Sequence, residues 1–193
     1  MLKRLNVASS CEARAGRILP CEVTMLTGKA RADANRVKVS GWDPRYRDDF
    51  VRLNEAWVTR YFAVEESDRR HFEDPEKTIV SPGGDIVFLV EDERCVGTCA
   101  LIACGDDVYE LAKMAVLESE LGRGLGDILM EATLQRAREL GARRIFLLSN
   151  TSLAPAISLY LKHGFKTVRL GSHSDYDRAD IEMAIDLESP PSF

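Results

Sequence analysis

Three glycines at alternate positions, Gly122, Gly124 and Gly126, mark the segment of this chain whose chemistry is easiest to interpret. Glycine lets the backbone approach a bulky anion and turn several N–H groups toward it. Apolar periodicity from Leu125 onward predicts a helix directly after the loop, and the first N–H groups of a helix have no partners inside it. The segment therefore predicts a phosphate cradle, made of Leu121, Gly122, Arg123, Gly124, Leu125, Gly126 and Asp127.

The glycine spacing alone leaves other interpretations open. A tight strand-to-helix turn without a ligand uses the same residue types. A dinucleotide fingerprint does not fit, because Asp127 or Leu129 stands where its third glycine is required. A P-loop does not fit, because no Gly-Lys-Ser/Thr sequence follows. A small phosphate- or nucleotide-binding regulatory domain remains an alternative to an enzyme.

The chain before the loop is predicted to contain helices followed by antiparallel strands. Residues 36–40 alternate polar and apolar side chains, as a half-buried strand does. Pro44 opens a helix that runs to Tyr61, and further helical segments follow. Three apolar stretches joined by short polar links then predict a meander of strands at residues 85–91, 95–104 and 108–117.

The chain after the loop alternates helices and strands. The helix from Leu125 closes at Gly141, and the nearly all-apolar residues 144–149 are typical of a strand buried on both faces. A helix at 153–163 and strands at 165–170 and 180–187 complete the pattern, and we expect the last strand at an exposed edge that permits a dimer. The fold class is α/β (mixed α+β), a mixed and partly antiparallel sheet of about six to seven strands flanked by helices.

The length and the segment composition predict one domain. The chain has 193 residues, of which we assign 36–187 to that domain. Residues 1–35 lack periodicity and a continuous apolar core, so we expect a disordered or loosely docked leader, and residues 188–193 form a tail.

Composition narrows the classes of partner and ligand. A net charge of −5 disfavours nucleic acid as the main partner, and no apolar run is long enough to predict a membrane span. The five cysteines are odd in number, which favours free thiols in a reducing cytoplasm over a disulfide framework. The three histidines are far apart, so no metal site is predicted.

Two ordered motifs together resemble the GCN5-related N-acetyltransferase (GNAT) superfamily over about residues 36–187. The family signature Gln/Arg-x-x-Gly-x-Gly/Ala is similar to the segment 121–126, except that Leu121 replaces the first residue. The segment 156–165, AISLYLKHGF, resembles the family's A-x-x-L-Y-x-x-x-G-F helix and strand. The resemblance implies an N-acetyltransferase domain of a bacterial-type branch whose substrate is unassigned.

The family resemblance also implies how the ligands bind. Acetyl-CoA, as cosubstrate and without a metal, would lie in a gap between the splaying strands 108–117 and 144–149. Its pantetheine arm would bond to the backbone of Met114, Ala115 and Val116. A small-molecule or peptidyl primary amine would enter from the opposite side and attack the thioester directly. The resemblance leaves the choice between monomer and homodimer open.

Direct attack of the amine on the thioester requires a general base for the amine and a general acid for the departing thiolate. Glu110 is the best candidate base, because it interrupts an apolar strand face where desolvation would raise its pKa. A salt bridge, for example with Lys113, is its structural alternative. Tyr160 matches the family's general acid, and a packing role is its alternative. Asn150 is expected to take over part of a coenzyme contact, because Leu153 replaces the family's usual asparagine.

The acceptor side is less defined by the sequence. Trp57 and Tyr61 on the first helix, and Tyr176 and Arg178 in the last polar loop, are the candidates for substrate contacts. A non-catalytic acyl-CoA sensor or partner-binding module on the same fold is the main alternative to an enzyme. It would need Gly124 and Gly126 but neither Glu110 nor Tyr160.

Overall fold

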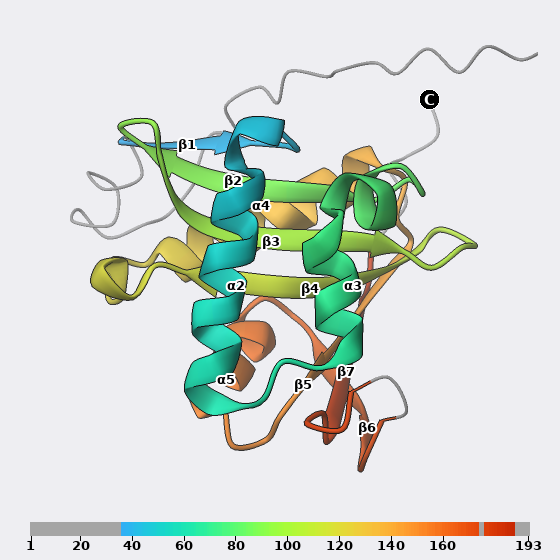
Figure 1. Cartoon of the computed structure of the whole chain (residues 1–193). Coiled ribbons are helices and arrows are strands. Elements are labelled where there is room, and N and C mark those ends of the chain that lie inside the picture. Colours follow the sequence, from blue (N-terminus) through green and yellow to red (C-terminus); the bar gives the residue numbers. More distant parts are fainter. Residues whose placement is uncertain (1–35, 174–175, 188–193) are drawn as a thin grey trace, which may run out of the picture.

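A seven-stranded sheet organises the computed structural model, which describes residues 36–173 and 176–187 (Figure 1). In the sheet the strands follow the order β1-β2-β3-β4-β5-β7-β6. The pairing is antiparallel throughout except between β4 and β5, which run parallel. The strands are β1 (Val37–Ser40), β2 (Asp85–Glu91), β3 (Arg94–Ala103), β4 (Val108–Val116), β5 (Arg144–Ser149), β6 (Lys166–Leu170) and β7 (Ile181–Asp186). The predicted mixed sheet is confirmed, whereas the leader and the tail lie outside the described residues.

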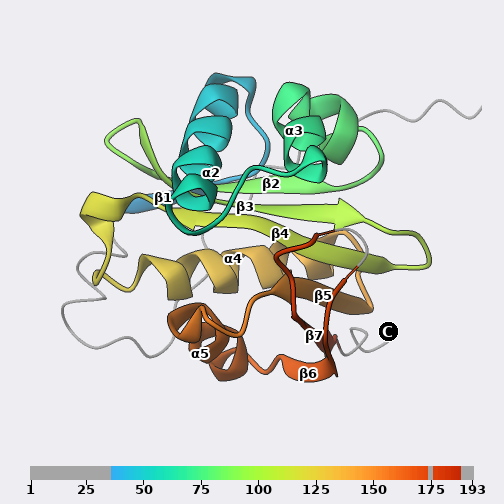
Figure 2. The ribbon, with the colours of Figure 1, turned by 60° about the horizontal axis from the view of Figure 1, so that its bottom comes forward.

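Helices cover both faces of this sheet. Figure 2 shows α2 and α3 on one face and α4 and α5 on the other. Pro44 starts a 3-10 turn that leads into α2, and the Asp43 carboxylate caps it by accepting from the N–H of Arg45. The helical elements are η1 (Pro44–Tyr46), α2 (Arg47–Tyr61), α3 (Glu66–Glu73), the π-helical turn η2 (Glu76–Val80), η3 (Glu118–Glu120), α4 (Leu125–Glu139) and α5 (Ala154–Lys162).

Each helical layer has its own apolar core against the sheet. On the α2–α3 side, Phe50 and Ile79 are fully buried and pack with Phe88 of β2. On the other side, Leu129 of α4 and Ile145 of β5 belong to the larger cluster. Burial on both faces of the central strands stabilises the sheet from which the site residues project. No helix in the described ranges has the length and apolarity needed to cross a bilayer.

The prediction that residues 180–187 form an exposed edge strand is wrong. Strand β7 lies between β5 and β6 and pairs with both of them. Met183 is fully buried, whereas all five residues of β6 are exposed, so burial of the apolar strand explains the inner position of β7. The outer strand on this side is β6, and a dimer through residues 180–187 has no basis.

Candidate active site

Strands β4 and β5 part from each other after the third residue of each strand. They form three parallel residue pairs, which end at Glu110 and Phe146. Beyond that pair, β4 continues against β3, and β5 continues against β7. Parted strands leave backbone N–H and C=O groups on their facing edges without ladder partners. The gap between residues 111–116 and 147–149 is therefore suited to an extended ligand that pairs with β4.

The glycine loop leads directly into α4 and has the expected backbone geometry. Gly122 and Gly124 have φ values of 80° and 76°, in the left-handed region that side chains disfavour. Gly124 is the N-cap residue of α4 and has no side chain to cap it. A Cβ built on Gly122 would meet no atom within 4 Å, so the space beside the loop is open. The free N–H groups of the first helical turn and its dipole fit an anionic group such as a diphosphate.

Two charged side chains of the loop region point to protein partners. The Arg123 guanidinium donates to both oxygens of the Glu91 carboxylate at 2.8 and 2.9 Å and to Glu120 at 2.5 Å. Arg123 thus ties the loop to the end of β2. Asp127 accepts hydrogen bonds from Lys162 at 2.6 Å and from His163 at 2.9 Å, which ties α4 to α5. Leu121 is 61% exposed. The contribution that this segment offers to an anion is therefore mainly its backbone.

A cavity of about 90 Å³ lies at the gap in the sheet. Its walls come from α2, β4, the end of β5, α5 and the segment 176–179, which are far apart in the sequence. Of the residues selected from the sequence, it brings together Glu110, Met114, Asn150, Tyr160, Trp57, Tyr176 and Arg178. The two candidate catalytic groups and most candidate acceptor contacts thus share one cavity.

Tyr61 is placed outside that cavity. Its ring is 50% exposed and packs beside Trp57 and Phe62, with centroid distances of 5.5 and 6.4 Å. Phe62 and Asn54 line the cavity instead, and neither was predicted from the sequence. Phe62 follows the last helical residue of α2, so helical periodicity gave no signal for it.

Glu110 and Tyr160 lie on opposite sides of the gap, on β4 and on α5. Burial, together with the neighbouring Cys99, raises the pKa of Tyr160 well above its usual range, and a hydrogen bond with Ser149 opposes this only in part. The phenol therefore keeps its proton at neutral pH. Asn150 donates to the Arg178 carbonyl at 2.7 Å and accepts from Ser152, so its amide already joins β5 to the loop before β7.

The buried Cys99 lies next to Tyr160. Burial raises the pKa of Cys99 to about 12, so this thiol is not a nucleophile at neutral pH. Within the described ranges no cluster of three His, Cys, Asp or Glu residues has the arrangement of a metal site.

Lys113, which the sequence suggested only as a possible salt-bridge partner of Glu110, also lines the cavity. A β-bulge interrupts the β3–β4 ladder between Thr98 and Ala100, and Lys113 has a φ of 52° at the bulge. The extra residue redirects the side chain of Lys113. Strand alternation by itself contains no sign of this irregularity.

Comparison with known proteins gives consistent matches. The sequence profile described as the acetyltransferase (GNAT) family matches residues 48–165. An uncharacterized N-acetyltransferase of Mycobacterium tuberculosis is 35% identical over 104 residues, which cover 51% of this chain and 67% of that relative.

Solved structures show the same fold. The crystal structure of an acetyltransferase of the GNAT family from Staphylococcus aureus superposes with a TM-score of 0.70 at 18% identity, covering 79% of this chain and 99% of that chain. A PaiA N-acetyltransferase from Thermoplasma acidophilum, solved in complex with coenzyme A, gives a TM-score of 0.62 at 17% identity and covers 78% and 99%.

Proposed function

Because this chain belongs to the acetyltransferase (GNAT) family, we propose that it transfers an acetyl group from acetyl-CoA to a primary amine on a small molecule or a peptide. The observation that carries the proposal is the gap between β4 and β5, which opens beyond Glu110 into a cavity shared with Tyr160. A relative of the same fold was solved with coenzyme A bound, which supports the same coenzyme for this chain.

The coenzyme-binding half of the site consists mainly of backbone groups. The N–H groups of residues 122–126 hold the diphosphate at the start of α4, where the helix dipole adds to the attraction. The backbone of Met114, Ala115 and Val116 pairs with the pantetheine arm along the free edge of β4. Acetyl-CoA supplies the acetyl group as a thioester, whose C–S bond breaks as the amine nitrogen forms the new N–C bond.

Glu110 and Tyr160 carry out the proton transfers of this reaction. An alkylammonium has a pKa of about 10, so the acceptor must lose a proton before it attacks. The Glu110 carboxylate takes that proton, directly or through a water. The Tyr160 phenol, which the raised pKa keeps protonated, gives its proton to the departing sulfur. Trp57, Tyr176 and Arg178 form the acceptor side of the cavity.

Thiol release in the presence of amines tests the proposal. The purified chain is incubated with acetyl-CoA and, one at a time, L-leucine, 2-phenylethylamine, spermidine and a trialanine peptide, and the acetylated amine is identified by mass spectrometry. We expect amine-dependent release of free coenzyme A. Binding of coenzyme A in calorimetry without transfer to any amine would instead identify a non-catalytic acyl-CoA sensor. Tighter binding of ATP or NAD than of coenzyme A would contradict the coenzyme assignment.

A further inference from the structure

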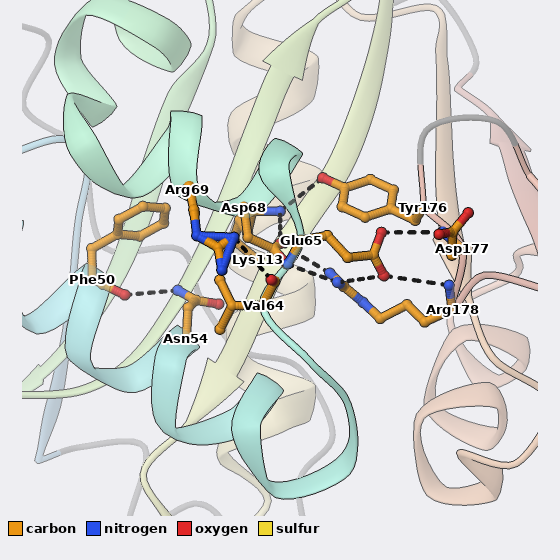
Figure 3. A network of polar contacts seen from close by, with 10 residues as sticks. All are labelled: Phe50, Asn54, Val64, Glu65, Asp68, Arg69, Lys113, Tyr176, Asp177 and Arg178. Atoms are coloured by element: carbon orange, nitrogen blue, oxygen red, sulfur yellow. Dashed lines mark hydrogen bonds and ion pairs between the residues drawn. The ribbon is translucent and has the colours of Figure 1, made fainter.

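A carboxylate outside the cavity holds together several parts of its wall. Asp68 of α3 is fully buried and does not line the cavity itself. Its oxygens accept from the Lys113 ammonium at 2.7 Å and from two nitrogens of the Arg178 guanidinium at 2.7 and 2.9 Å (Figure 3). Three elements that are distant in the sequence, α3, β4 and the loop before β7, therefore meet at Asp68.

Lys113 reaches Asp68 because of the bulge in β4. Its side chain is 4% exposed, and its ammonium also donates to the Tyr176 hydroxyl at 2.8 Å. A non-glycine residue with positive φ is strained and persists where the surroundings hold it. The hydrogen bonds of the Lys113 ammonium to Asp68 and to Tyr176 hold this conformation in place. They also join the bulge in β4 to the loop before β7.

The segment 176–178 is held by its backbone as well as its side chains. The Glu65 carboxylate accepts from the backbone N–H groups of Asp177 at 3.1 Å and Arg178 at 3.3 Å. The Tyr176 ring lies beside both cations, with its centroid 4.8 Å from the Lys113 ammonium and 4.7 Å from the Arg178 guanidinium. This network is visible in Figure 3.

The charges of the network balance one another. Lys113 and Arg178 contribute two positive charges, and Asp68 and Glu65 two negative ones. Burial acts to raise the pKa of Asp68, but Arg178 and Lys113 outweigh it and lower the pKa to about 2. Asp68 is therefore ionised at working pH, and the formal charges of the four side chains sum to zero. Such an arrangement is better suited to fixing a wall than to attracting an acidic acceptor.

We propose that Asp68 is a positioning residue for the acceptor amine. It contacts no substrate, but it fixes Lys113, Tyr176 and Arg178 as one wall of the cavity, facing the gap that Glu110 borders. The wall aligns the amine with the thioester, so that loss of Asp68 weakens acceptor binding without removing the coenzyme site at α4. The inference rests on the proposed acetyl transfer.

The substitution Asp68→Asn keeps the shape of the side chain and removes its charge. With the best amine of the panel above, we expect KM for the amine to rise about tenfold or more, because an interaction that orients the acceptor is lost. The dissociation constant of coenzyme A, measured by calorimetry, should stay within about twofold of the parent value.

Asp85→Asn is the matched control. Asp85 is 4% exposed, accepts from Arg136 at 2.6 Å, and does not line the cavity. This variant should lose stability but keep its KM for the amine. Tyr176→Phe is a milder second test if Asp68→Asn does not fold, because it removes only the hydroxyl that accepts from Lys113. We expect the same selective rise in KM for the amine, at smaller size.

Each outcome has a separate meaning. An unchanged KM for the amine in Asp68→Asn and Tyr176→Phe would overturn the inference while the proposed transfer stands. So would a loss of coenzyme A affinity in these variants as large as the rise in KM for the amine. Failure of the parent chain to acetylate any amine would overturn the proposed function and this inference with it.

Discussion

Glu110 and Phe146 form the last residue pair of the parallel β4–β5 ladder. The candidate base therefore lies at the point where the sheet opens, rather than along the open edge. A carboxylate at this point borders the cavity that Tyr160 borders from α5. The position of Glu110 is thus fixed by strand pairing and does not depend on a loop.

The role of Glu110 as base predicts a loss of turnover in Glu110→Gln. We expect kcat to fall about 100-fold or more, because the amide cannot accept the proton of the ammonium. Affinity for coenzyme A should be unchanged. Glu131→Gln, an exposed position on α4, is the control and should keep full turnover. Parental kcat in Glu110→Gln would show that the carboxylate is structural.

The raised pKa of Tyr160 predicts a particular pH dependence. Because the phenol stays protonated well above neutral pH, its donor function is present across the usual assay range. Tyr160→Phe should therefore lower kcat about tenfold or more at every pH from about 7 to about 9. The pH profile of kcat for both proteins checks this. A deficit confined to the alkaline end would contradict the assigned role.

The left-handed conformation of Gly124 predicts a loss of coenzyme binding in Gly124→Ala. Alanine there costs about 1 kcal/mol and shifts the N–H groups that face the diphosphate. Gly141→Ala is the matched control, because Gly141 has a φ of 84° at the opposite end of the same helix. Both variants should lose similar stability in thermal melts, and only the first should bind coenzyme A more weakly. Equal affinities in calorimetry would place the diphosphate elsewhere.

The ion pairs of Arg123 predict a small effect of its side chain on the coenzyme. Glu91 and Glu120 already engage the guanidinium. Arg123→Ala should change the dissociation constant of coenzyme A less than about threefold, while the loss of the two ion pairs lowers folding stability slightly. Calorimetry and urea unfolding measure the two effects. A large loss of affinity with unchanged stability would show that the guanidinium exchanges its partners for phosphate.

The lowered pKa of His71 predicts that the folding stability depends on pH. Burial, with the neighbouring cations Lys113 and Arg70, lowers the pKa of His71 to about 4, against about 6.5 in an unfolded chain. Between these values the unfolded chain binds a proton that the folded chain does not, so stability falls as the pH is lowered through this window.

Unfolding in urea at about pH 7.5 and about pH 5 measures this loss, to which His71 contributes at most about 2 kcal/mol. His71→Leu should show a smaller loss between the two pH values. The same loss in the leucine variant would assign the pH dependence to other groups.

Local patterns in the sequence were enough to predict most helices and strands and the glycine loop. The strand at β4, the glycine loop and α4 each depend on neighbouring residues, so periodicity and turn chemistry predicted them. The joint presence of Glu110 and Tyr160 in one cavity followed from the family resemblance, since 50 residues separate them in the numbering and no local pattern links them.

The features that were missed depend on pairing between distant segments. The place of β7 inside the sheet is set by the burial of Met183 against strands far away in the chain. The bulge at Lys113 and its bond to Asp68 join α3 to β4. Arg123 likewise meets a partner on β2. A propensity for one conformation does not encode such partners.

The inner position of β7 has a consequence for the order of folding. Strand β5 pairs on one side with β7, whose residues follow it in the chain by more than 30 positions. Strand β6 pairs with β7 as well. While the ribosome is still making residues 181–186, β5 and β6 lack the strand that joins them. Half of the coenzyme gap is therefore built on contacts with large sequence separation, which slow folding. Before β7 is added, one edge of the apolar strand β5 has no partner, and such an edge favours aggregation during folding.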